Sequence, residues 1–356
     1  MPSRKAEQIA LILREEILSG ARAPGAKLPT YDALMEQFQV TRPTVARVLD
    51  ALREEGLVSE KGARGVFVAE RFPHHDRYLW VTSEQPGSLE WTSFMATFLD
   101  LIERGETGIP GSVVPLVGVD GRANNPAYKM LCEVVEQRSA AGLLLMNSST
   151  VYQLPALEKE GLPRAAIWAP LPHAGLVNLD FDSLLERACA RLMEKGQRLA
   201  IMSPHEPNLK RAENLLLGRG FPESKLWPLH VAVVGCERVT ELLFDRADRP
   251  DALLVTDDNL IEPLLRGLKR ANVDPKRDVY VLGHCNFPRP IGLGQGVEHI
   301  GFDVREIFAA AKTVIDAQRA GEAMPTVTVH PRFADELIQP LPAPSKPSHS
   351  RPVQST

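Results

Sequence analysis

Hydrophobic and polar residues alternate with two different spacings along this chain. In the first 70 residues, apolar side chains recur three or four positions apart, which is the spacing of one face of a helix. From about residue 78 onward, short apolar runs alternate with longer amphipathic segments, which is typical of strands alternating with helices. The pattern predicts a small helical region followed by a much larger α/β region.

Three helices and a hairpin are predicted in the helical region. A first helix covers residues 6–18, and helices over 30–38 and 41–55 follow. The hydroxyls of Thr30 and Thr41 are placed to accept a backbone N–H at the starts of the second and third helices. The three helices should pack together through their apolar faces.

The third predicted helix has one buried and one outward face. Its apolar stripe consists of Val45, Val48, Leu49 and Leu52. The residues that must then point outward are Pro43, Ala46, Arg47 and Asp50. The outward surface is small and polar near its beginning, which suits insertion into a groove. Next, an extended run opens at 57–58, turns at 62–65 and returns at 66–68, which predicts a hairpin with an arginine at its tip.

Strands and helices alternate through the α/β region. Strands are expected at 78–82, 113–117, 142–146, 165–168, 199–202, 252–255 and 279–282. Amphipathic helices are expected at 91–104, 126–138, 183–195 and 260–271. Near-continuous apolar strands indicate parallel sheets covered on both faces, and roughly 260 residues suit two lobes better than one sheet.

Four segments are expected in the chain order. Residues 1–69 form the helical head, and 70–77 form a polar linker interrupted by a proline. Residues 78–339 form the two-lobed α/β domain. Residues 340–356 are rich in Pro and Ser without periodic apolar positions, so this tail is expected to be disordered.

The composition of the chain argues against several classes of protein. The 356 residues are 44% apolar and 24% charged, as in ordinary globular proteins, and the net charge of −4 argues against a general nucleic-acid or anionic-membrane coat protein. No apolar run approaches the ~20 residues of a membrane span, and the N-terminus does not look like a signal peptide. The four cysteines are far apart, which fits reduced thiols in a cytoplasm better than disulfides or a zinc site.

The first seventy residues or so resemble the winged helix-turn-helix of GntR-type transcription regulators. The lead helix, ILSGARAPGAKLPT, TRPTVARVLDALREEGLV and the GARGVFV wing carry the resemblance in the family's order and spacing. The resemblance implies that residues 41–55 are the recognition helix in the major groove and that the wing reaches adjacent DNA. The residues expected at DNA are Thr30, Tyr31, Thr41, Arg42, Pro43, Thr44, Arg47, Lys61, Arg64 and Gly65. Asp32 and Ala46 depart from the usual family pattern, so base preference is not carried over.

The charge of the head leaves an alternative open. Residues 1–70 contain ten basic and ten acidic side chains, so one head should bind duplex DNA weakly and depend on a dimer. The same balance is compatible with a head that docks another protein instead of DNA.

Most of residues 78–335 resemble the effector-binding domain of LacI/GalR-type regulators, which is similar to periplasmic sugar-binding proteins. The carrying phrases are VEQRSAAGLLLM, VNLDFDSLLERACARLMEKGQRLAIMS, RPDALLVTDDNLIEPLLRGLKRANVDPKRDVYVLGH and VEHIGFDVREIFAAAKTVIDAQRAGEAMPTVTVHPRF. A GntR-type head joined to such a domain looks like the arabinose-repressor type of architecture.

The second resemblance implies an effector cleft at the carboxyl ends of the strands, between the lobes. The residues expected there are Ser83, Trp91, Asn147, Arg211, Asp257, Cys285 and Asn286. Alternatively, Trp91 belongs to the core and Arg211 forms a surface pair with Glu206 or Glu213. Residues 283–286 read Gly-His-Cys-Asn where the family often has an acidic pair, which leaves open a different ligand class or a weakened site.

The sequence therefore predicts a cytoplasmic, ligand-responsive transcription regulator, most simply a repressor. Its expected partners are a palindromic double-stranded operator, a small sugar-like effector and a second copy of the chain, with no cofactor, metal or membrane. The chain has no GxSxG or HExxH motif, which argues against an enzyme. The alternative is a small-molecule-binding interaction protein whose head docks a protein.

Overall fold

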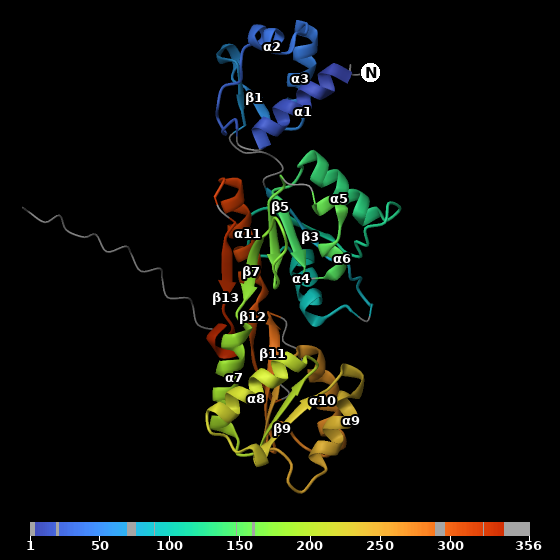
Figure 1. Ribbon diagram of the computed structural model, residues 1–356, viewed down its shortest axis with the longest axis vertical. Coiled ribbons are helices and arrows are strands. Elements are labelled where there is room, and N and C mark those ends of the chain that lie inside the picture. Colours follow the sequence, from blue (N-terminus) through green and yellow to red (C-terminus); the bar gives the residue numbers. More distant parts are fainter. Residues whose placement is uncertain are drawn as a thin grey trace, which may run out of the picture.

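The computed structural model describes residues 4–18, 21–69, 76–88, 90–146, 148–158, 161–288, 296–322 and 324–337. Figure 1 shows a small helical head at one end, followed by two larger lobes. The greater part of the predicted linker and all of the predicted tail lie outside the described residues. Among the described residues, no helix is long and apolar enough to cross a membrane.

The head has the predicted three helices and hairpin. The helices are α1 (Arg4–Leu18), α2 (Tyr31–Phe38) and α3 (Arg42–Glu54). The strands β1 (Val58–Glu60) and β2 (Val66–Val68) pair antiparallel around a 3-10 turn at Gly62–Arg64. This confirms the prediction of a winged helix-turn-helix.

The two predicted caps differ. The Thr30 hydroxyl accepts a hydrogen bond from the Ala33 backbone N–H at 3.3 Å, as expected. Thr41 was expected to do the same for α3, but its Oγ1 instead lies 3.1 Å from Oγ1 of Thr44 and accepts no capping bond. Pro43 in the first turn of α3 removes one of the N–H groups that such a cap would serve.

A single apolar core holds the head together. All four residues of the predicted α3 stripe are buried, and they pack against apolar residues of α1, α2 and the wing. Leu13, Leu34 and Leu52 are among the most completely buried side chains. The outward residues Arg42, Pro43 and Arg47 remain exposed, so the amphipathic pattern placed the two faces of α3 correctly.

The first lobe is built on a parallel sheet with the order β13-β7-β6-β5-β3-β4. Its strands are β3 (Arg77–Val81), β4 (Ser112–Leu116), β5 (Gly142–Met146), β6 (Arg164–Ile167), β7 (Gly175–Leu179) and β13 (Thr326–Val329). Helices α4 (Ser93–Arg104), α5 (Pro126–Gln137), the short α6 (Ser149–Tyr152) and α11 (Val304–Arg319) pack around it.

The second lobe has a sheet with the order β14-β12-β11-β10-β8-β9, in which only the pairing of β14 with β12 is antiparallel. Its strands are β8 (Leu199–Ser203), β9 (Leu226–His230), β10 (Ala252–Val255), β11 (Tyr280–Phe287), β12 (Val297–Asp303) and β14 (Arg332–Phe333). Its helices are α7 (Phe181–Lys195), α8 (Glu206–Gly218), α9 (Val233–Phe244) and α10 (Ile261–Arg270).

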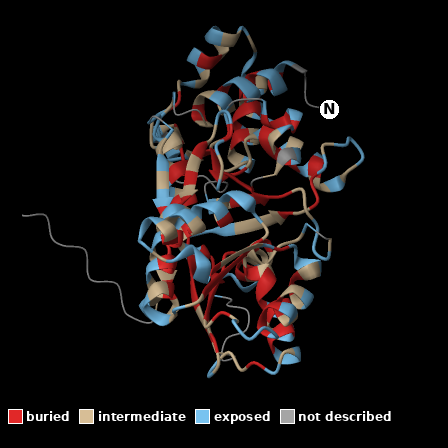
Figure 2. Ribbon diagram, turned by 60° about the horizontal axis from the view of Figure 1, so that its bottom comes forward, coloured by how far each residue is buried: buried red, intermediate tan, exposed pale blue. Residues whose placement is uncertain are grey.

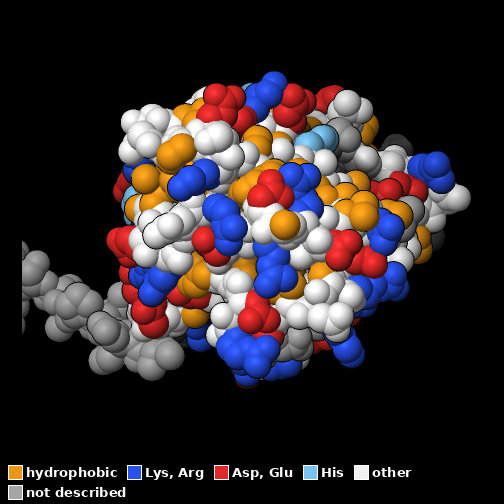
Figure 3. Space-filling view, turned by 90° about the horizontal axis from the view of Figure 1, so that it is seen from below, with side chains coloured by type: hydrophobic (Ala, Val, Ile, Leu, Met, Phe, Trp, Pro, Cys, Tyr) orange, Lys and Arg blue, Asp and Glu red, His pale blue; other side chains and the backbone are white. Residues whose placement is uncertain are grey.

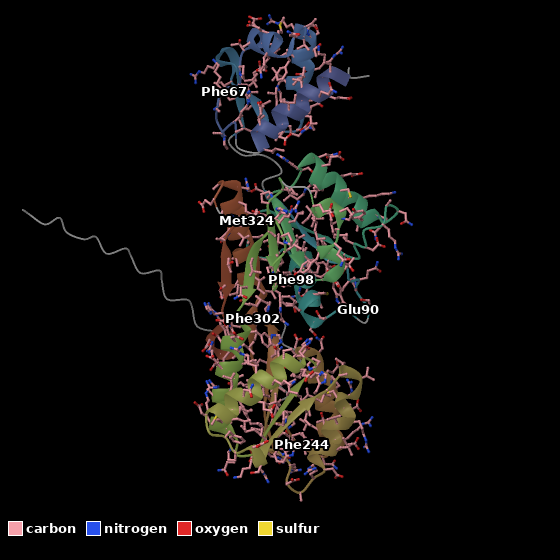
Figure 4. The ribbon with its side chains drawn as sticks, in the orientation of Figure 1. Phe67, Glu90, Phe98, Phe244, Phe302 and Met324 are labelled. Carbon is pink, nitrogen blue, oxygen red and sulfur yellow. The ribbon has the colours of Figure 1, made fainter. Side chains whose placement is uncertain are left out.

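The chain passes between the two lobes three times. It crosses after β7, after β12 and after β13, because each of these elements is followed by an element of the other lobe. Buried aromatic rings fill the junction: Phe98 and Phe308 lie 4.9 Å apart between ring centroids, and Phe302 belongs to the same apolar cluster. Figure 4 labels Phe98 and Phe302 near this junction. The lobes therefore share a continuous core at their hinge.

Burial follows the predicted layering. Figure 2 shows the central strands buried between helices whose outer faces are exposed. On the face of the second lobe seen in Figure 3, acidic and basic side chains are interspersed. Each of the seven predicted strands is present and starts within one residue of its predicted position, whereas β7, β9, β12, β13 and β14 were not predicted. The fold class, a winged helix-turn-helix plus a two-lobed α/β domain, is confirmed.

Candidate functional site

The face of the head formed by α3 and the wing presents several exposed cations. The guanidinium of Arg42 lies over the ring of Tyr31, 5.3 Å from its centroid, which holds this side chain at the start of α3. The Nζ atom of Lys61 lies 5.2 Å from the centroid of Phe67 on the wing, which Figure 4 labels. Arg64 is exposed at the tip of the wing. The ring contacts place Arg42 and Lys61 on this face, and their contact with DNA stays a prediction.

Lys27 also joins the wing, although the sequence reading did not include it. Its Nζ lies 6.0 Å from the centroid of the Phe67 ring, on which Lys61 also packs. Lys27 and Phe67 form an isolated antiparallel bridge, so a segment ahead of α2 runs beside the hairpin. Gly65 has φ +104°, and a Cβ there would lie 3.1 Å from Cε of Lys27, so glycine gives this lysine its room. No local pattern in the sequence signals this pairing.

Among the described residues of the head, some of the basic residues form ion pairs with acidic residues, and others do not. Arg53 pairs with Asp50 at 2.6 Å and with Glu60 at 3.2 Å, and Arg14 pairs with Glu55. No described residue forms an ion pair with Lys27, Arg42, Arg47 or Arg64. Asp50 of α3, Glu60 of the wing and Glu55 each pair with an arginine, which a count of charges along the sequence could not show.

Arg47 has a different position from Arg42. It lines a groove of about 450 Å³ between α1 and α3, together with Glu7, Leu11 and Arg14. Arg47 is exposed, as expected for an outward residue of α3. Its expected contact with DNA stays a prediction.

A second candidate site is a cavity of about 480 Å³ between the lobes. Its walls come from the carboxyl ends of strands in both sheets and from the starts of α4, α7 and α8. The lining residues are Thr92, Phe94, Met95, Met146, Ile167, Trp168, Phe181, His205, Pro207, Asn208, Thr256, Asp257, Asp258, Asn259, His284 and Asn286. Open α/β sheets place small ligands at this edge, and the volume is within the range of ligand pockets.

Hydrogen bonds join the two lobes across this cavity. Oδ1 of Asp257 accepts from the backbone N–H of Asn259 at 2.9 Å and from its Nδ2 at 2.7 Å. Oδ1 of Asn259 in turn accepts from the backbone N–H and the hydroxyl of Ser93, both at 3.1 Å. Because Ser93 begins α4 of the first lobe, Asn259 connects a cavity carboxylate to the opposite lobe.

A buried polar cluster forms the floor on the second-lobe side. Asn286 donates from Nδ2 to Oδ2 of Asp258 at 2.8 Å. Burial, followed by the charge of Asp257, raises the pKa of Asp258 to about 7. Burial lowers the pKa of His284 to about 4, so this imidazole is neutral at pH 7. Oδ1 of Asn286, Oγ1 of Thr256 and Nε2 of His284 are buried without a hydrogen-bond partner, which points to a polar ligand.

An aromatic wall faces the polar floor. Trp168, which follows β6, is 40% exposed and has φ +83°, an unusual conformation for a bulky residue. Its ring packs against Phe94 at 6.0 Å and Phe181 at 5.7 Å between centroids. Strain of this kind costs about 1–3 kcal/mol and clusters at binding sites. The cavity therefore has one aromatic side and one polar side.

The structure brings two of the expected effector residues to this cavity. Asp257 and Asn286 line it, and their binding role stays a prediction. Asn147 lies outside the described residues. Ser83 does not line the cavity; its hydroxyl is 2.7 Å from that of Ser148 and donates to Glu84 at 2.8 Å.

Three other expected residues lie elsewhere for identifiable reasons. Trp91 precedes α4 and packs edge-on against Trp80 in the core, with centroids 6.3 Å apart. Arg211 is on the surface and pairs with Asp182 at 2.9 Å, not with either glutamate considered from the sequence. Cys285 is fully buried, since β11 continues to Phe287 instead of ending near residue 282. Alternation along that strand turns its neighbours toward the cavity and the cysteine away.

The sequence reading missed Asp258, His284 and Trp168. Asp258 adjoins Asp257, which lines the cavity as expected, and His284 adjoins Cys285, which does not, so the expected segments border the cavity although Cys285 faces away from it. Trp168 was read as the last residue of a strand. Its place at a carboxyl strand end was the signal that could have identified it. Among the described residues, no group of three or more His, Cys, Asp or Glu side chains could hold a metal ion.

Comparison with known proteins agrees with this geometry. Residues 5–68 match the family model "Bacterial regulatory proteins, gntR family". The head is a GntR-type domain. The chain is 22% identical over 298 residues to the arabinose metabolism transcriptional repressor of Halalkalibacterium halodurans, covering 76% of this chain and 78% of that protein.

Other relatives share less of the chain or only its fold. An uncharacterized HTH-type transcriptional regulator of Bacillus subtilis, YisV, is 31% identical over 99 residues, which cover 26% of this chain and only 19% of that protein. A regulatory protein of the LacI family from Chloroflexus aggregans covers 73% of this chain and 96% of its own length, with a TM-score of 0.55 and 15% identity. The lobes thus have the fold of LacI-family regulators, and these relatives are regulators rather than enzymes.

Proposed function

We propose that this chain is a ligand-responsive, sequence-specific DNA-binding transcription regulator that acts as a repressor and catalyses no reaction. One observation carries the proposal: a GntR-type head with cations on α3 and the wing is joined to two lobes that enclose a polar, partly unsatisfied cavity. The arabinose metabolism transcriptional repressor, which the chain resembles over most of its length, supports repression and a sugar-like effector.

Contacts between the head and the first lobe provide a route for the signal. Nη2 of Arg138 at the end of α5 is 2.9 Å from Oε1 of Glu15 on α1. Arg138 has φ +49°, and its guanidinium lies against Gly161, where a Cβ would come within 2.5 Å. A shift of the first lobe therefore moves a side chain that touches the head.

The mechanism we infer is closure of the lobes around the effector. Ligand bridges the polar floor and the aromatic wall, strengthens the contact between Asn259 and Ser93, and changes how two copies pack side by side. Their heads must sit about 34 Å apart, or a multiple of that, to reach two half-sites of a palindromic operator. A coupling of typically 1–3 kcal/mol would change operator occupancy by about 5- to 150-fold. We expect the homodimer to act in the cytoplasm.

Genome-wide footprinting of the full-length protein tests this function. Discrete palindromic sites, whose occupancy depends on the cations of α3, are the expected result. Absence of such sites, together with a protein partner recovered through the head, would support a head that docks protein instead of DNA.

A further inference from the structure

The cavity between the lobes carries acidic groups and, among its described lining residues, no arginine or lysine. Asp257 and Asp258 follow one another after β10, and both line the cavity. His284 contributes no positive charge at pH 7 because burial lowers its pKa. His205 stands at the rim, with its side chain 64% exposed and Nε2 3.7 Å from Oδ2 of Asp257. The charge that complements this lining is a cation.

The polar groups in the floor of the cavity favour a ligand that donates hydrogen bonds. Oδ1 of Asn286 is a pure acceptor, since the Nδ2 of the same amide already donates to Asp258, and this oxygen has no partner. Asn286 is 1% exposed and Thr256 2% exposed, and both line the cavity. Both ends of the Asn259 amide are engaged, by Ser93 and by Asp257. Of the three unpartnered atoms in the floor, Oδ1 of Asn286 can only accept, whereas Oγ1 of Thr256 and Nε2 of the neutral His284 can accept or donate, so all three can receive a hydrogen bond from the ligand.

The aromatic wall suits the same kind of ligand. Trp168 is exposed to the cavity, and Phe94 and Phe181 support its ring. An aromatic face attracts a positive charge through its quadrupole and stacks on the apolar face of a sugar ring. A carboxylate or phosphate in this space would instead face two aspartates without a described cation to pair with.

Resting on the regulator function proposed above, we propose that the effector carries a protonated amine, which Asp257, Asp258 and Asn286 bind while the remaining polar skeleton lies against Trp168. The amine supplies donors to the acceptor-rich floor. Asp258, whose pKa burial raises to about 7, can lose its proton near neutral pH when a cation arrives. Amino sugars belong to this chemical class, whereas sugar acids and sugar phosphates are excluded from it.

Matched hexoses test the proposal on the full-length protein by isothermal titration calorimetry and thermal shift. One series is glucose, glucosamine and glucuronate, and the other is galactose, galactosamine and galacturonate. In the series whose skeleton fits, we expect the amine to bind about tenfold or more tightly than the neutral sugar, because charge-assisted hydrogen bonds are roughly twice as strong as neutral ones. Equal or tighter binding of a neutral or acidic member, or no binding of either amine, would overturn the proposal.

Isosteric variants of the two aspartates test whether they bind the amine. Asp257→Asn keeps the acceptor for the Asn259 backbone and should reduce the preference for the amine to about threefold or less. Asp258→Asn provides the same test if the first variant does not fold. The control Asp248→Asn removes an exposed carboxylate that pairs with Arg246 at 2.8 Å outside the cavity, and it should keep the full preference. An unchanged preference in both cavity variants would contradict the assigned amine position.

The test of the ligand class and the test of the regulator function can succeed or fail independently. Calorimetry involves no DNA, and footprinting needs no effector. Operator sites without amine binding would refute only the ligand class, whereas amine binding without operator sites would refute only the DNA-binding role.

Discussion

Replacing Arg42 by alanine tests the DNA-facing surface without knowledge of the operator. Arg42 is held over Tyr31 at the start of α3, and no described carboxylate pairs with it. Arg53 lies on the same helix but is paired with Asp50 at 2.6 Å and Glu60 at 3.2 Å. We therefore expect Arg42→Ala to remove a phosphate contact, whereas Arg53→Ala removes none.

The expected size follows from counterion release. Each phosphate contact contributes about 0.9 to the slope of log affinity against log salt concentration. The four cations Lys27, Arg42, Lys61 and Arg64 on each of two heads would together contribute about −7 to this slope. Losing Arg42 from both heads should make this slope about 1.8 smaller in magnitude. When the salt concentration rises from 50 to 200 mM, the affinity of both proteins falls. The factor by which it falls should be about ten times smaller for the variant than for the wild type.

Fluorescence anisotropy with a labelled non-operator duplex measures the slope at several salt concentrations. Circular dichroism of both variants checks that the head remains folded. The assignment of this face would be refuted by an unchanged slope for Arg42→Ala, or by an equal change in Arg53→Ala.

Three further predictions concern stability and motion. Burial raises the folded-state pKa of Asp258 from its ordinary 3.8 to about 7, so the stability it contributes is present below about pH 4 and is lost as the pH rises through 7. Urea unfolding at pH 5 and pH 8 measures this loss of stability, which should be absent in Asp258→Asn. An equal loss of stability in the wild type and the variant would contradict the raised pKa. Asn259→Ala removes two inter-lobe hydrogen bonds to Ser93, worth about 1–3 kcal/mol together, so small-angle X-ray scattering should show more open lobes. Leu52→Ala should lower the free energy of unfolding of the head by about 2–5 kcal/mol in denaturant titrations, and a loss below 1 kcal/mol would contradict its fully buried place.

The elements of this protein could be predicted because each depends on neighbouring residues. The helical spacing of Val45, Val48, Leu49 and Leu52 fixes which face of α3 is buried, and all four are buried in the structure. Runs such as 142–146 are typical of strands covered on both faces, and Gly142–Met146 is such a strand. The order of strands and helices then restricts the large region to parallel sheets.

Only the tertiary structure decided which side chains share the cavity. Asn259 meets Ser93, which is 166 positions away in the chain, because the crossings between the lobes bring α4 and the segment after β10 face to face. Because β11 continues to Phe287, Asn286 faces the cavity and the buried Cys285 faces away from it. No local pattern sets where that strand ends.

The sequence by itself determined a winged helix-turn-helix head, two α/β lobes and the segments that border the cleft. The structure decided which of the side chains in those segments face the cavity and which partners they meet. Lys27 shows the difference in a single residue, since only the bridge to Phe67 brings it to the wing. The physical reason is that periodicity records local burial, whereas a binding site is assembled from strand ends whose register and crossings involve residues far apart in the chain.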